Sequence, residues 1–134
     1  MKKLLLMLSL VVALALIIDS APANAEDTGY AFVFAYSHKL KAAYHSLIVA
    51  HPAKGQSLSA DEYNADIKLI RRMEDAFEQY IRTKMRLNTA LFTLSARTGY
   101  KSEAIAQNRL EAEKINLKTQ GLEMKLVPDF IFKP

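Results

Sequence analysis

The chain has 134 residues, a formal net charge of +4 and no cysteine. A chain of this length forms one domain with a core of its own. The absence of cysteine excludes disulfides and thiolate chemistry, so packing alone must stabilise the fold. So small an excess of positive charge does not indicate a nucleic-acid partner.

The N-terminal segment has the pattern of a secretory signal peptide. Lysines occupy positions 2 and 3, residues 4–18 contain one polar side chain, and residues 23–25 read Ala-Asn-Ala, which fits the small-x-small cleavage rule. The apolar run is shorter than the roughly 20 residues that a membrane-spanning helix needs. We therefore predict cleavage after Ala25, export to the periplasm of a bacterium, and a single domain over residues 26–134.

The next segment contains two competing periodicities. Aromatic side chains occupy every second position from Tyr30 to Tyr36, which is the period of a strand, and apolar side chains then follow at helical spacing as far as His51. Pro52 stops a helix. We predict a helix over residues 28–51. The alternative is a short strand over residues 29–36.

A second, longer helix is predicted over residues 60–98. The loop over residues 52–59 contains Pro, Gly and Ser, and Ser59-Ala60-Asp61-Glu62 has the pattern of a capping box. No Pro or Gly then occurs before Gly99.

The third helix is predicted over residues 103–126, with Gly121 as a weak point inside it. Apolar side chains lie on two sides of this helix, which indicates two neighbours, one of which is the tail, the first helix or a second molecule. The sequence therefore predicts an all-α fold, an elongated three-helix bundle with a long central helix and an irregular C-terminal tail. The alternative is an α+β fold with a short N-terminal strand and a C-terminal hairpin from residues 114–127.

No constellation for catalysis or metal binding emerges from the sequence. His38 and His45 are seven residues apart, about 10 Å along a helix, which is too far for one metal ion. The carboxylate pairs at i,i+4 spacing lack the Glu-x-x-His pairs of di-iron sites, and no nucleophile elbow or phosphate loop occurs. We predict no catalytic residues, no metal, no cofactor and no enzymatic activity.

Two features point to a partner. Phe32 and Phe34 lie off the core stripe of the predicted first helix and would form an apolar contact patch with Tyr30. The segment between Gln79 and Ser102 contains no acidic residue. On a continuous helix it would place three arginines on one polar stripe, able to meet an acidic protein or phospholipid headgroups. These are Arg82, Arg86 and Arg97. The alternative, which the sequence favours, is that the stripe is the solvated back of a bundle helix.

A small-ligand site is the alternative. Lys84 and Asn88 interrupt the apolar stripe of the predicted second helix, and a polar group there must find a partner or reach the surface. With Tyr44 they would line a polar pocket between the first two helices.

The sequence resembles no protein family that we recognise. We predict an exported periplasmic helical protein that acts by protein–protein interaction or self-association, as an adaptor, a chaperone-like protein, an immunity protein or a subunit of an envelope or secretion assembly. The alternatives are a small-molecule binder or enzyme with a pocket around Lys84 and Asn88, and a protein that binds an anionic membrane surface.

Overall fold

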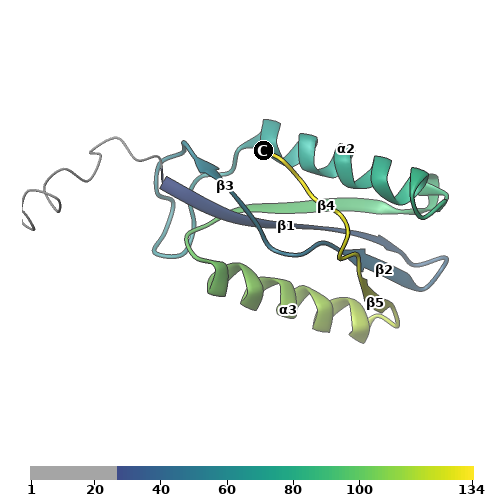
Figure 1. The fold of residues 1–134 in the computed structure, drawn as a ribbon. Coiled ribbons are helices and arrows are strands. Elements are labelled where there is room, and N and C mark those ends of the chain that lie inside the picture. Colours follow the sequence, from purple (N-terminus) through teal and green to yellow (C-terminus); the bar gives the residue numbers. More distant parts are fainter. Residues whose placement is uncertain (1–26) are drawn as a thin grey trace, which may run out of the picture.

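The computed structural model describes residues 27–134, so the predicted signal peptide lies outside the described part of the chain. Figure 1 shows a mixed β-sheet with one helix on each face. The protein is therefore α+β, and the predicted all-α three-helix bundle is wrong. The elements in chain order are β1 (Asp27–Ser37), β2 (Ala42–His45), β3 (Val49–Ala53), α2 (Ile67–Thr83), the 3₁₀ helix η1 (Thr89–Leu91), β4 (Thr93–Tyr100), α3 (Glu103–Thr119) and β5 (Glu123–Leu126).

Strand β1 is the centre of the sheet. Along one side it pairs antiparallel with β4, and along the other side it pairs antiparallel with β3 and then β2. Strand β5 extends the sheet beyond β2, to which it runs parallel. The α+β alternative therefore has the right fold class and the right N-terminal strand, but the C-terminal element is this single strand and not a hairpin.

The segment predicted as a first helix, residues 28–51, forms three strands. Strand β1 is apolar at consecutive positions because both of its faces are buried. Phe32 and Phe34 point towards α3, whereas the smaller Ala31 and Val33 between them point towards α2. The period of two in the aromatic residues was therefore the correct signal, and the helical spacing further along the chain was accidental. Leu40 and Leu47 from that helical stripe are exposed.

Strands β2 and β3 both pair with the same side of β1 and are separated by residues 46–48. The Ser46 N–H donates to the Val33 carbonyl over 2.9 Å, and the Ser46 hydroxyl accepts from the Val33 N–H over 3.0 Å. A serine side chain thus replaces the missing partner of the Val33 N–H in the central strand.

The helix predicted over residues 60–98 is instead α2, η1 and β4. The Ser59 hydroxyl accepts from the Glu62 N–H over 3.1 Å, as in a capping box, but it closes a turn that no helix follows. Helix α2 begins only at Ile67, and the carboxylate of its N-cap residue Asp66 accepts from the Leu69 N–H. The chain leaves the helix through Arg86, which has a left-handed φ of 55°. Because non-glycine residues rarely adopt this conformation, the sequence offers no marker for this end.

The helix predicted over residues 103–126 ends earlier, at Thr119, and Gly121 follows its C-terminal cap. Gly121 has a φ of 85°, and its N–H donates to the Lys118 carbonyl while the Leu122 N–H donates to the Leu117 carbonyl. This is a Schellman motif, in which glycine supplies the left-handed residue after the helix. The chain therefore turns at Gly121 and continues as β5.

Candidate functional site

The predicted aromatic patch lies in the core. The side chains of Phe32 and Phe34 are 0% and 3% exposed, and Tyr30 is half-buried. The Phe32 ring stacks on Tyr100 of β4 with a centroid distance of 5.9 Å. In a strand, alternate side chains lie on the same face, so Phe32 and Phe34 both point towards α3. The prediction had placed them on the outside of a helix. A surface patch that includes both phenylalanines is therefore wrong.

The three predicted arginines do not form a stripe because no single helix carries them. Arg82 lies in the last turn of α2 and pairs with Glu78 over 4.0 Å, Arg86 is in the turn that follows, and Arg97 lies on β4. The Arg97 guanidinium is 3.5 Å from the Glu113 carboxylate of α3. These are exposed pairs, which contribute little to stability.

The predicted ligand residues are also separated. Lys84 is exposed at the C-terminal cap of α2, and the exposed Asn88 caps η1 by accepting from the Ala90 N–H. Tyr44 lies on β2, where its ring packs against Phe92 at a centroid distance of 5.9 Å. The pocket was predicted to lie between two helices. The first predicted helix is instead a set of strands, so Tyr44, Lys84 and Asn88 lie apart and have different structural roles.

His51 holds together three strands. It lies on β3 beside Gly29 of β1, and its Nε2 accepts from the Gly99 N–H of β4 over 3.1 Å. Its Nδ1 therefore carries the proton and donates to the Pro52 carbonyl over 3.0 Å. A Cβ atom on Gly29 would lie 2.4 Å from the ring, so the ring crosses β1 only because Gly29 has no side chain. This histidine has a structural role.

His45 is buried on the other face of the sheet, opposite Phe34 in the strand register. Its Nδ1 lies 2.9 Å from the Ser46 carbonyl. Burial lowers the pKa of His45, a backbone hydrogen bond to Ser46 opposes this effect, and Lys114 of α3 lowers the pKa further. On the same face burial raises the pKa of the Tyr100 hydroxyl, and the Glu62 carboxylate adds to that effect.

A groove of about 550 Å³ lies between α3 and β5. Ile115, which is 65% exposed, lies on its helical wall, and Leu122 and Met124 lie on its strand wall. Leu126, 47% exposed, continues that wall because alternate residues of a strand share a face. Lys114 and Lys118 are at the rim, and Lys114 pairs with Glu111 over 3.2 Å. The sequence signalled this surface only as the second apolar side of the third helix.

Strand β5 is the last strand on its side of the sheet among residues 27–134. The N–H groups of Glu123 and Val127 donate towards β2, to the carbonyls of Lys41 and His45. Because successive residues of a strand direct their backbone groups to opposite sides, the N–H and C=O groups of Met124 and Leu126 face outward. The groove therefore borders an unpaired strand edge.

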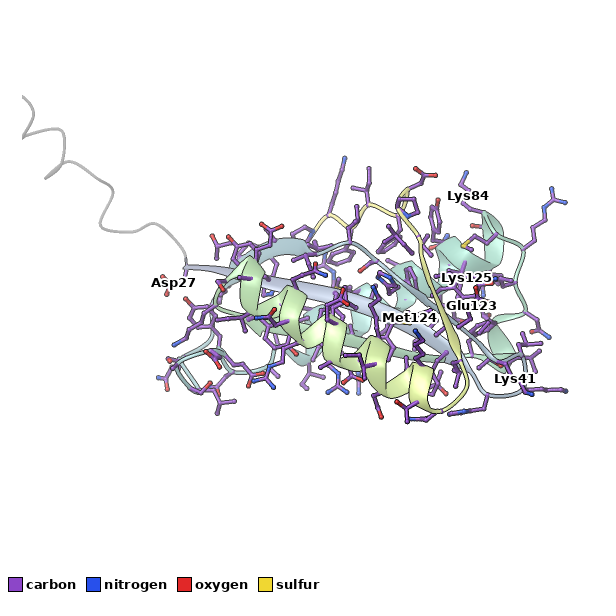
Figure 2. All side chains as sticks on the ribbon, turned by 90° about the horizontal axis from the view of Figure 1, so that it is seen from below. Asp27, Lys41, Lys84, Glu123, Met124 and Lys125 are labelled. Atoms are coloured by element: carbon purple, nitrogen blue, oxygen red, sulfur yellow. The ribbon has the colours of Figure 1, made fainter. Side chains whose placement is uncertain are left out.

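Cationic side chains gather at one end of the protein. Figure 2 shows Lys41 and Lys84 at the end opposite Asp27, with Glu123, Met124 and Lys125 on β5 beside α3. Helices α2 and α3 both end there, so these cations lie near the negative ends of two helix dipoles.

Residues 27–134 contain no group of three side chains arranged to bind a metal ion. In the same part of the chain, neither helix has the length and apolar content needed to span a membrane. No protein family, curated protein or solved structure matches the chain. A proposal for its function must therefore come from the surface of the protein.

Proposed function

We propose that this protein is exported to the periplasm and acts there by binding another polypeptide chain in the groove between α3 and β5. The groove is lined mainly by apolar atoms, and it lies against outward-facing backbone donors and acceptors of β5. An extended polypeptide satisfies both features, because it adds a strand to an open sheet edge and places alternate side chains in an adjoining apolar groove.

The observation that supports this proposal best is the position of Ile115. A large apolar side chain that is 65% exposed is common by itself, but this one lines a groove that borders an open strand edge. Exposed strand edges in monomeric proteins are usually short, charged or covered. Edge β5 is short and charged, but its Met124 and the preceding Leu122 give an apolar side towards α3.

The absence of cysteine permits a direct test by single-cysteine labelling. Ile115→Cys would carry a thiol-linked photocrosslinker in the groove, and Ile67→Cys, 59% exposed at the start of α2, is the matched control on the other helix. We expect a crosslinked adduct in the periplasmic fraction from position 115 and none from position 67. Equal adducts from both positions, or none from either, would contradict the proposed binding surface.

Export is tested separately. We expect the protein in the periplasmic fraction with Glu26 as its first residue, because residues 23–25 fit the cleavage rule. Recovery of the uncleaved chain from the cytoplasm would contradict this part of the proposal.

A second candidate function is attachment to an anionic membrane surface. The turn between β1 and β2 carries exposed Lys39 and Lys41, and the turn after α2 carries exposed Lys84 and Arg86 at the same end of the protein. Four cations at one end of the protein attract acidic headgroups within about a Debye length. We expect cosedimentation with phosphatidylglycerol vesicles that disappears in 0.5 M salt; no cosedimentation in about 10 mM salt would exclude this candidate.

A further inference from the structure

The segment Leu122-Glu123-Met124-Lys125-Leu126 has a symmetric pattern of apolar and charged side chains about Met124. Leucine occupies both ends, methionine the centre, and opposite charges the two positions between. We propose that the groove and edge of β5 bind a second copy of this chain, through antiparallel β5–β5 pairing centred on Met124. This inference rests on the proposed function and names its partner.

The hydrogen-bonding pattern of β5 suits this register. Backbone groups of Met124 and Leu126 face outward, so two Met124 residues opposite each other form a hydrogen-bonded pair. The Leu126 N–H then meets the Leu122 carbonyl of the second copy. The Leu122 N–H already donates to Leu117 within α3's terminal turn, so the pairing yields four intermolecular hydrogen bonds and does not disturb that turn.

The charges select the same register. In a symmetric antiparallel strand pair, the two-fold axis is perpendicular to the sheet. Even-numbered residues therefore lie opposite even-numbered residues, and odd-numbered residues opposite odd-numbered ones. Centring on Glu123 would place two carboxylates opposite each other, and centring on Lys125 would oppose two ammonium groups. Only centring on Met124 places Glu123 opposite Lys125, and it does so twice.

A proline just after β5 limits the pairing to this segment. Pro128 comes two residues after Leu126 and has no N–H to offer. The strand can therefore pair only over residues 122–126, the symmetric segment itself.

The two-fold axis also accounts for the exposed apolar side chains. It brings both α3 helices to the same side of a continuous sheet, so Ile115 faces the second copy and Leu126 packs opposite Leu122. A strand pair of this length buries less than the roughly 1,600 Å² of a standard interface, so we expect a weak dimer with a dissociation constant on the order of 0.1–1 mM.

Charge reversal and rescue test the pairing in sedimentation equilibrium of the purified protein. Glu123→Lys creates two Lys–Lys pairs, and we expect it to raise the dissociation constant at least about tenfold. The double variant Glu123→Lys with Lys125→Glu restores two opposite-charge pairs, and we expect a constant within about threefold of the original value. Both positions are exposed, so the variants should fold normally.

A second measurement uses the cysteine-free background. Met124→Cys places two thiols across the axis at a Cα separation of about 5.5 Å, within the range of a disulfide. We expect rapid oxidation to a covalent dimer, whereas Ile67→Cys should remain mainly monomeric under the same conditions.

Three results would overturn the self-pairing: a monomer at all concentrations up to about 1 mM, an unchanged dissociation constant in Glu123→Lys, or failure of the double variant to recover. If the protein is monomeric but position 115 still crosslinks a different polypeptide, the self-pairing fails and the proposed function stands. If position 115 crosslinks nothing, the proposed function fails as well.

Discussion

On the α2 face of the sheet, small side chains of β1 lie under large side chains of the helix, whereas on the α3 face the large side chains come from β1 itself. Met73 and Phe77 of α2 cover Ala31 and Val33, and Phe130 of the C-terminal tail closes the layer. On the other face Phe32 and Phe34 fill most of the space, and α3 adds a narrower stripe. The strand therefore sets how much apolar surface each helix must supply.

This difference explains why α3 leaves a large apolar side chain exposed beside the edge of β5. The apolar stripe of α2 is buried from Leu69 to Ile81. Helix α3 buries only Ala106, Leu110 and Leu117, and Ile115 remains exposed at the groove. A face that is filled from the sheet needs less of its helix, and the remainder is free to contact a partner.

Each face also contains one buried histidine, but the two are held differently. On the α2 face, both ring nitrogens of His51 have hydrogen-bond partners. On the α3 face, His45 has one ring contact, to Ser46, and lies near charged groups of α3. We call the α2 face the closed face, because the apolar stripe of its helix is buried and both ring nitrogens of its histidine are hydrogen-bonded. We call the α3 face the open face.

The largest expected effect is Phe77→Ala on the closed face. The ring is fully buried and packs edge-on against Phe130 with a centroid distance of 5.0 Å. We expect the free energy of unfolding to fall by about 3–5 kcal/mol in urea denaturation. A loss below about 1 kcal/mol would show that this face can collapse around the cavity and is not rigidly closed.

Ser46→Ala tests the interruption between strands β2 and β3. It removes the hydroxyl that accepts from the buried Val33 N–H, so the free energy of unfolding should fall by about 1–3 kcal/mol. Ser57→Ala in the exposed loop is the control, with an expected change below about 0.5 kcal/mol. Equal losses in both variants would mean that the central strand does not need this acceptor.

Gly29→Ala tests the fixed histidine. The added methyl group would lie 2.4 Å from the His51 ring, and we expect a loss of about 1–3 kcal/mol in the free energy of unfolding. Adding His51→Ala removes the clash, so the double variant should be more stable than the sum of the single losses predicts. Strict additivity in this cycle would show that the ring is displaced without cost.

A pH titration tests the histidine of the α3 face. Burial lowers the pKa of His45 in the folded state, so the unfolded chain takes up a proton first, near its usual pKa of about 6.5. This contribution is therefore fully present above about pH 6.5 and is lost as the pH falls. We expect the free energy of unfolding to decline between pH 7 and 5, and to decline less steeply in His45→Gln. An unchanged slope in that variant would contradict the assignment.

Ile115→Ala should have the smallest effect on stability. Because this side chain is mainly exposed, we expect the free energy of unfolding to change by less than about 0.5 kcal/mol. The difference between the losses of unfolding free energy in Phe77→Ala and in Ile115→Ala would then compare the packing of the two helices against the sheet. A loss near 2 kcal/mol or more would place Ile115 in the core and remove the argument for an exposed binding surface.

Part of the fold was readable from single residues. The alternation from Tyr30 to Tyr36 indicated β1, and the alternative of extended structure within residues 114–127 included the segment that forms β5. Both were overruled by helical spacing in neighbouring segments, since periodicity cannot separate a short buried strand from a helix without knowledge of its neighbours. The candidate site was visible only as excess apolar surface on the third helix, and the phenylalanines chosen for a contact patch are in the core.

The sequence by itself determined the composition of the core, the chemistry without cysteine, and local contacts such as the Ser59 hydroxyl accepting from Glu62 and the left-handed turn at Gly121. Only the tertiary structure decided that the Ser59 hydroxyl closes a turn with no helix directly after it. It also decided that Gly121 follows the end of α3 and leads into β5. The physical reason is that a strand is stabilised by partners distant in the chain. Val33 needs Ser46 on one side and Ala96 on the other, and no local pattern records those pairings.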